Sequence, residues 1–187
     1  MRRVVLAGLL GAIQIVCCAA DSPSRTDLVR VLARDAHAAL GHRKMDLLQP
    51  HESIADALVT SLGISDEQAG SDPVAPNVFA VAGCRPHSCD EKAFGIVDMA
   101  ENKVLLAAIR HFRCHVEQQS GARNKDKRPV SCDASPTITL FLFEPGLRSS
   151  PSVTEENLLN HAREWGRRFG PAEEQIVRVK AGIDPAA

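Results

Sequence analysis

Aromatic residues are scarce in this chain of 187 residues, which has no tyrosine, one tryptophan and six phenylalanines. Proteins that bind single-stranded nucleic acids stack the bases on aromatic rings, so this composition argues against that function. Common enzyme motifs are also absent: there is no Gly-x-Ser-x-Gly elbow, no phosphate-binding glycine loop and no His-Glu-x-x-His pair. We therefore predict that the protein is not an enzyme and uses no cofactor.

Long apolar runs are absent beyond residue 16. Residues 1–20 begin with a basic head, continue with an apolar stretch over 4–16 and end in small residues. This pattern predicts an export signal that is cleaved after Ala20, because the stretch is shorter than the roughly 20 residues of a spanning helix. We expect a periplasmic protein with no integral membrane segment after signal removal. Secretion stays open as an alternative, and Cys17 and Cys18 leave a lipid anchor open, although a bulky residue precedes the first.

An excess of either charge is also missing once the signal is set aside. The signal holds two of the 22 basic residues and none of the 23 acidic ones, so residues 21–187 carry a net charge of −3. This balance favours neither nucleic acid nor an anionic membrane as a partner. The 167 remaining residues suit one compact domain.

Four cysteines follow the signal: Cys84, Cys89, Cys114 and Cys132. An even number of cysteines in an exported chain predicts disulfides. Three pairings are possible, and we favour Cys84–Cys89 and Cys114–Cys132 because each closes a local ring.

A metal site is the alternative use of these cysteines. His111 and His115 flank Cys114, and with the other cysteines and His87 they offer enough nitrogen and sulfur for zinc. However, the two Cys-x-x-Cys pairs of a zinc ribbon are absent, and an oxidising compartment converts paired thiols into disulfides. We therefore predict no metal ligands.

The spacing of apolar residues predicts three helices, over residues 25–40, 54–62 and 152–169. Ser152 and Glu155 form a capping signature at the start of the third helix. Trp165 lies on its apolar face and is expected to anchor it in the core. His37 and His51 have no partner at ligand spacing and are expected at the surface.

Strand-forming residues dominate the part between the second and third helices. They predict strands over residues 78–83, 94–99, 104–112 and 137–143, and a short edge strand over 175–180. Because helices come first and hairpins follow, we predict an α+β fold. Its antiparallel sheet would have about four to five strands, with helices packed on one face.

The segment between the first two predicted strands carries the main functional hypothesis. It consists of Cys84, Arg85, Pro86, His87, Ser88 and Cys89. A disulfide between its ends leaves the ring little freedom, and the proline fixes one more backbone angle next to the histidine. We expect the imidazole to project on a rigid turn, which avoids the entropy that a flexible loop loses on binding.

This segment resembles the loop Cys-Lys-Pro-His-x-Cys that is the hallmark of the Ivy family, the inhibitors of vertebrate lysozyme. The resemblance extends to residues 78–81, 94–97 and 104–106, whereas the Cys114–Cys132 segment is unlike the family. It implies a small antiparallel sheet with helices on one side, and a loop that enters the active-site cleft of a host c-type lysozyme. The loop contacts would be His87 as the plug, Arg85 near the cleft rim, Pro86 and Ser88.

The chemistry implied by the resemblance suits an imidazole. Lysozymes of this type use two carboxyl groups about 5 Å apart. An imidazole has nitrogens on two edges and can form hydrogen bonds toward both carboxyls.

Two other functions stay open from the sequence. One is a structural or interaction module of the bacterial envelope in which the disulfide only stabilises the loop, and the other is a small exported metal-binding protein. The sequence also leaves a homodimer open. The basic residues 123–128 are expected to form a solvated loop that offers a secondary contact for polyanionic cell-wall material.

Overall fold

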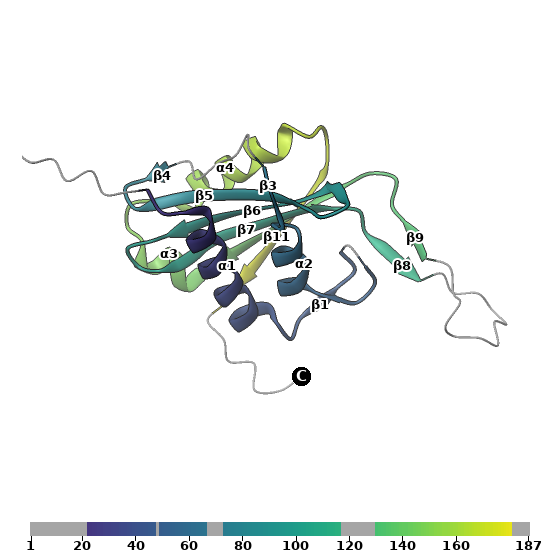
Figure 1. Ribbon diagram of the computed structural model, residues 1–187, viewed down its shortest axis with the longest axis horizontal. Helices are drawn as coiled ribbons and strands as arrows, with labels where there is room; N and C mark the ends of the chain where they lie inside the picture. Colours follow the sequence, from purple (N-terminus) through teal and green to yellow (C-terminus); the bar gives the residue numbers. More distant parts are fainter. Residues whose placement is uncertain (1–21, 48, 67–72, 117–129, 181–187) are drawn as a thin grey trace, which may run out of the picture.

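The computed structural model describes residues 22–47, 49–66, 73–116 and 130–180 (Figure 1). The predicted signal, Cys17, Cys18 and the basic residues 123–128 lie outside the described residues. The helices are α1 (Arg25–Leu40), α2 (Ile54–Thr60), α3 (Glu144–Ser149) and α4 (Glu155–Arg167). Within the described residues, no helix is both long and apolar enough to span a bilayer.

A seven-stranded sheet forms the centre of the fold, in the order β11-β10-β7-β6-β5-β3, with β4 pairing along β5. Its strands are β3 (Ile64–Ser65), β4 (Pro73–Ala75), β5 (Val78–Arg85), β6 (Ser88–Asp98), β7 (Lys103–His111), β10 (Thr137–Phe143) and β11 (Glu173–Val179). Two small two-stranded sheets join β1 (Lys44–Met45) with β2 (Glu52–Ser53), and β8 (Cys114–Val116) with β9 (Val130–Cys132). The predicted α+β class is confirmed, although the sheet has more strands than expected.

All neighbours in the main sheet are antiparallel except β10 and β11, which are parallel. Parallel strands need a long crossover, and α4 supplies it between β10 and β11. This arrangement confirms the predicted edge strand. It also shows that α4 packs on the sheet of its own chain.

Helices cover both faces of the sheet, not the one face that we predicted (Figure 1). One core cluster joins α1 and α2 to residues such as Val81 and Ile109, and the other joins α4 to residues such as Ala80 and Ala108. Every residue of β7 from Val104 onward is buried. A continuous apolar run, as opposed to an alternating one, is typical of a strand that is covered on both sides, and this was the sequence signal for a second helical layer.

The caps of the helices follow the sequence closely, with one correction. Ser24 caps α1 by accepting a hydrogen bond from the Asp27 amide. The cap of α4 is Thr154, which accepts from the Asn157 amide, and not Ser152 as predicted. Ser152 lies in the turn before the helix, where its hydroxyl is 3.4 Å from that of Ser150. Either residue type satisfies a free amide of the first turn.

Both favoured disulfides are present, Cys84–Cys89 and Cys114–Cys132. The second joins β8 to β9 at positions that face each other across the small hairpin. Two disulfides are consistent with an oxidising, extracytoplasmic compartment.

Trp165 is the core anchor that the sequence predicted, with 2% of its surface exposed. Its ring stacks on Phe94 at a centroid distance of 5.3 Å and meets the edge of Phe169 at 5.5 Å. His37 and His51 are exposed, as expected.

His111 ends β7 and is buried, whereas its neighbour in the motif, His115, is exposed. Its Nε2 atom lies 3.0 Å from the hydroxyl oxygen of Thr139 on β10. Burial lowers the pKa of His111 to about 4, because the interior disfavours the charged imidazolium.

We expect this buried imidazole to make stability fall in mild acid. The unfolded chain binds a proton at His111 below pH 6.5, whereas the folded chain does so only near pH 4, so protonation favours unfolding between these values. The loss should reach about 3 kcal/mol of unfolding free energy. Denaturant unfolding of wild type and His111→Gln from pH 7.5 to 4 measures it as a difference in slope. The exposed His42→Gln variant serves as the control, and equal slopes for His111→Gln and wild type would contradict the assignment.

Candidate functional site

The turn between β5 and β6 consists of Pro86 and His87, with Arg85 paired to Ser88 on either side. His87 has a φ of +67°. A proline followed by a residue of positive φ is the signature of a type II turn, which normally has glycine at that position. Histidine is among the side chains that tolerate this conformation best. The turn places His87 at the tip of the hairpin, where its side chain is exposed.

A bulge behind the turn brings the two cysteines together. Cys84 pairs with Lys92, whereas the next residue of β5 pairs with Ser88, so Cys89, Asp90 and Glu91 are extra residues in β6. The disulfide joins this bulge to β5 across a Cα–Cα distance of 4.8 Å. The ring is therefore closed covalently at the point where regular pairing stops.

Pro86 rests on the turn that follows α2. A Cβ atom at Gly63 would lie 2.9 Å from the Cδ and Cγ atoms of Pro86, so only glycine leaves room for the proline ring. The next residue, Ile64, begins β3 and pairs with Cys84. The turn is thus supported by a segment about twenty positions earlier in the chain, as counted from the residue numbers.

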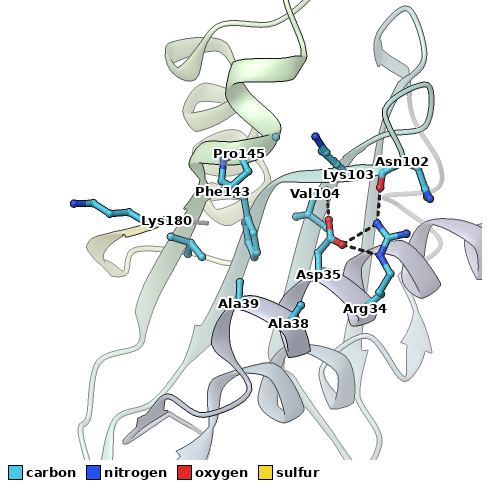
Figure 2. A pocket seen from close by; sticks show the side chains of 12 residues that line it. Arg34, Asp35, Ala38, Ala39, Asn102, Lys103, Val104, Phe143, Pro145 and Lys180 are labelled. Atoms are coloured by element: carbon cyan, nitrogen blue, oxygen red, sulfur yellow. Dashed lines mark hydrogen bonds and ion pairs between the residues drawn. The ribbon is translucent and has the colours of Figure 1, made fainter. Parts of the chain in front are cut away.

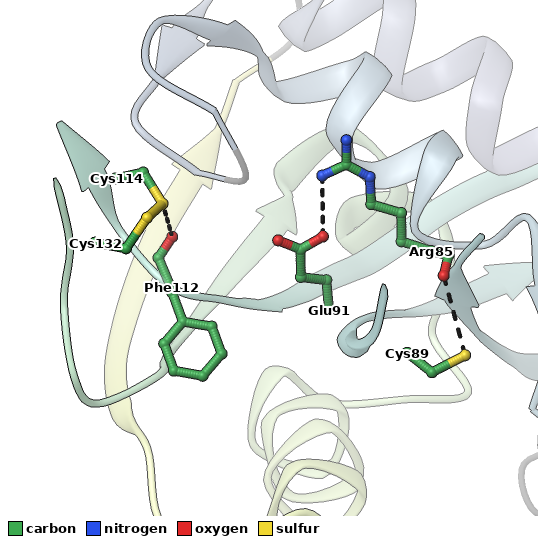
Figure 3. Close-up of polar contacts among 6 residues, drawn as sticks. All are labelled: Arg85, Cys89, Glu91, Phe112, Cys114 and Cys132. Carbon is green, nitrogen blue, oxygen red and sulfur yellow. Dashed lines mark hydrogen bonds and ion pairs between the residues drawn. A yellow bond between two sulfur atoms is a disulfide. The ribbon is translucent and has the colours of Figure 1, made fainter. Parts of the chain in front are cut away.

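Arg85 points back into the protein and not toward the tip. Its guanidinium is 2.9 Å from a carboxylate oxygen of Glu91, and both side chains are mostly buried, with 24% and 15% exposed. Figure 3 shows the two side chains meeting on the side of the strand that faces α1 and α2, while Cys89 lies on the other side. Cys89 Sγ is 4.0 Å from the Arg85 carbonyl oxygen. The expected place of Arg85 at a cleft rim does not match this orientation.

A second carboxylate, that of Glu52 on β2, lies near the same guanidinium. Burial raises the pKa of Glu52, and the attraction of Arg85 opposes this only in part. One of its oxygens is buried without a hydrogen-bond partner. Arg85 therefore pairs with Glu91 and attracts Glu52, which links the base of the turn to β2.

Arg110 of β7 binds the bulge from the face of the sheet that α4 covers. It donates to the carbonyl oxygens of Asp90 at 3.1 Å and Phe169 at 3.0 Å, and so links the bulge to the end of α4. Lys92 adds a cation–π contact, with its ammonium 4.5 Å from the centre of the Phe169 ring. The base of the turn is thus fixed to both helical layers.

The imidazole of His87 differs from these supporting groups because no hydrogen bond or ion pair engages it among the described residues. Pro86 beside it is also exposed, and Ser88 is half-buried. A neutral imidazole presents one donor and one acceptor nitrogen, and its protonated form presents two donors. The site offers a single amphoteric hydrogen-bonding group on a rigid support.

The alternative metal site is not assembled in the described part of the chain. No three histidine, cysteine or acidic side chains come close enough there to hold an ion. The four cysteines are joined in disulfides, and disulfide sulfurs are not the thiolates that zinc or a nucleophilic mechanism requires.

A hollow of about 270 Å³ lies at the other end of the sheet, between α1, the β6–β7 turn, α3 and the end of β11 (Figure 2). Its floor is apolar and includes Phe143. Its one carboxylate, Asp35, accepts hydrogen bonds from the Val104 amide at 2.9 Å and from Arg34 at 2.8 Å. Arg34 also donates to the Asn102 carbonyl oxygen. These polar groups are engaged with one another and attach α1 to the β6–β7 turn. We therefore regard His87 as the stronger candidate for a functional site.

Comparison of the chain with protein-family models, with curated proteins and with solved structures finds no match. The candidate site therefore stands on its own geometry and on the resemblance of its hexapeptide.

Sequence analysis missed the residues that support the turn. Gly63, Glu52 and Arg110 are far from the hexapeptide in the chain, and none belongs to a local motif. Glu91, two residues beyond Cys89, is near enough to have been considered as the partner of Arg85. The parity of β5 was the available signal, since alternate residues point to opposite faces.

We expect Arg85 to contribute to stability through these contacts. Arg85→Ala leaves two partly buried carboxylates without their cation, which should lower the unfolding free energy by about 1–3 kcal/mol. Arg148→Ala is the matched control, since that arginine is 80% exposed and its ion pair with Glu144 should contribute less than about 1 kcal/mol. Urea unfolding of both variants measures the difference. Equal stabilities would mean that Arg85 does not hold the turn.

Proposed function

We propose that this protein is a periplasmic inhibitor of a host c-type lysozyme and that it inserts His87 into the enzyme's active-site cleft. The observation that carries the proposal is an exposed imidazole without a partner in the described structure, at the tip of a turn closed by Cys84–Cys89. The resemblance of residues 84–89 to the Ivy loop supports the choice of target.

The target's chemistry explains why one imidazole is enough. The two catalytic carboxyls of a retaining lysozyme are about 5 Å apart, one protonated and one ionised. An imidazole between them can accept a hydrogen bond from the acid and donate one to the carboxylate. This occupies both catalytic groups and the space of a sugar, so the inhibitor needs no chemistry of its own.

The support of the turn explains why the complex would be tight. A loop that becomes ordered on binding loses conformational entropy, which subtracts from affinity. Here the disulfide, the contact of Pro86 with Gly63 and the two arginine clamps fix the turn in advance. In this proposal Pro86, His87 and Ser88 contact the enzyme, and Arg85 acts by positioning them. The net charge of −3 adds a weak attraction to a basic enzyme.

Removing the imidazole is the first test. We expect His87→Ala to raise the inhibition constant against a c-type lysozyme by at least about 30-fold, since side chains at the centre of an interface contribute about 2 kcal/mol or more. His87→Asn keeps a residue that tolerates positive φ and should lose inhibition as well. Cell-wall lysis assays with purified variants of verified fold measure the effect.

His161→Ala, which removes another exposed imidazole, is the control and should inhibit as wild type. Unchanged inhibition by folded His87→Ala would remove His87 from the mechanism. A folded wild-type chain that leaves lysozyme fully active would instead favour the envelope module without inhibitory activity.

The two disulfides allow a matched test of preorganisation. Opening the small ring with Cys84→Ala and Cys89→Ala should weaken inhibition by on the order of tenfold, because the turn regains entropy in the free state. Removing Cys114 and Cys132 should lower stability by up to about 3 kcal/mol and leave the inhibition constant unchanged. Equal inhibition by the two double variants would show that closure of the small ring does not matter.

A further inference from the structure

The strand β11 forms one edge of the main sheet. Its seven residues pair with β10 on one side, and no strand of the described part of the chain pairs with it on the other. The opposite edge is formed by β3, which has two residues, and by β4, whose pairing with β5 is irregular. Short strands and irregular pairing protect an edge from association, and β11 has neither feature.

The unpaired backbone groups of β11 belong to three residues. The Glu173 amide donates to the Pro136 carbonyl oxygen at 3.0 Å, so the backbone groups of Glu173 face β10. Successive residues of a strand direct these groups to opposite sides, so those of Glu174, Ile176 and Arg178 point to the open edge. Among the described residues, no hydrogen bond engages them.

The side chains of the same three residues make this edge complementary to itself. Ile176 is 43% exposed, with Glu174 two positions before it and Arg178 two positions after it. All three lie on the face that α4 covers, where Glu174 binds Arg163 at 2.7 Å and Arg178 binds Glu155 at 2.6 Å. Charged side chains commonly protect an edge strand. Here, however, two opposite charges are equally far from an apolar centre.

An antiparallel pair of two β11 strands, with the two-fold axis at Ile176, fits this pattern. Ile176 then lies opposite Ile176 of the second copy, and Glu174 lies opposite Arg178 of the second copy, twice by symmetry. Each of these three pairs is hydrogen-bonded, because the backbone groups of all three residues face the edge. The ion pairs with α4 continue the pattern, so charges of alternating sign cross the seam.

Other alignments of the two strands fit less well. A parallel pair in register places Glu174 opposite Glu174 and Arg178 opposite Arg178, and like charges that face each other are destabilising. An antiparallel pair centred on Gln175 places Ile176 opposite Glu174, and one centred on Val177 places it opposite Arg178. Only the alignment centred on Ile176 joins unlike charges and brings the two apolar side chains together.

We infer that two copies of this chain associate through β11 and continue the main sheet across a two-fold axis at Ile176. The inference is independent of the proposed function, because the His87 turn joins β5 to β6 near the other edge of the sheet. The strand registers align Lys92 of β6 with Glu174, so the turn projects beyond the beginning of β11. The two-fold axis therefore directs the two His87 turns to opposite ends of the dimer and leaves both accessible.

The first test is the mass of the purified protein in solution. Sedimentation over a range of concentrations should show a monomer–dimer equilibrium for the wild-type chain. Ile176→Lys places two like charges opposite each other at the axis and should raise the dissociation constant at least about tenfold. Val130→Lys is the control, because Val130 is 54% exposed on β9, outside the main sheet, and should leave the constant unchanged.

A wild-type chain that stays monomeric at every concentration would overturn the inference, and so would equal dissociation constants for Ile176→Lys and wild type. Thermal unfolding of each variant verifies that it folds. Ile176→Lys should inhibit lysozyme as the wild-type chain does, so the dimer and the proposed function fail independently.

Exchanged charges test which residues face each other. Glu174→Arg and Arg178→Glu should each weaken the dimer, because like charges then meet on both sides of the axis. A mixture of the two variants restores both unlike pairs and should form a heterodimer, which native mass spectrometry detects. Each variant loses a surface ion pair with α4, which costs the fold little. A mixture of folded variants that forms no heterodimer would overturn the alignment.

A crosslink tests the position of the axis. The Cα atoms of a hydrogen-bonded antiparallel pair are about 5.5 Å apart, within the reach of a disulfide. Ile176→Cys should therefore form a covalent dimer on oxidation. Glu174→Cys is the control and should not, because this alignment separates the two copies of position 174 by four residues, roughly 13 Å along the strand. Equal crosslinking of the two variants, or crosslinking of Glu174→Cys alone, would overturn the position of the axis.

Discussion

The pairing of β5 with β6 is the constraint on which the rest of the structure depends. Its residues contribute to the cores on both faces of the sheet, so the register of this hairpin fixes where α1, α2 and α4 pack. The same register determines which way each residue points at the far end, where Cys84 makes the last regular pair. A shift by one residue would exchange the two faces and turn the disulfide toward α2. The core and the candidate site are therefore set by a single alignment of two strands.

The turn keeps its shape because both helical layers hold it. Gly63 and Glu52 support it from the α2 side, and Arg110 ties the bulge to the carbonyl oxygen of Phe169 at the end of α4. A disulfide alone closes a ring but does not fix the direction in which the ring points. The direction of the ring is fixed by contacts with segments that are remote in the chain, which pack the hairpin tip against the rest of the domain.

Features that depend on residues close together in the chain could be predicted from the sequence, whereas those that depend on remote residues could not. Elements with strong local periodicity, such as residues 25–40 and 137–143, were predicted closely, and the two disulfides followed from their short spacing. The second helical layer was missed, although the uninterrupted burial of β7 is the pattern that indicates it. The inward direction of Arg85 was missed, although the parity of β5 and the nearby Glu91 were signals for it. Its second acidic neighbour, Glu52, is brought close by tertiary packing and has no local signal in the sequence.

Two histidines have a positive φ, and they differ in whether a contact within the described structure explains it. His51 has a φ of +56°, and its backbone amide and ring both lie against a carboxylate oxygen of Asp46, at 2.8 and 3.4 Å, which explains its conformation locally. His87 has nearly the same φ but no such contact in the described structure. Glycine would fit either turn without the strain that a side chain brings, which is about 1 kcal/mol or more. At His51 the side chain offsets this strain within the protein. At His87 no contact among the described residues offsets it, and this difference between the two histidines is the structural basis of the proposal that His87 meets a partner.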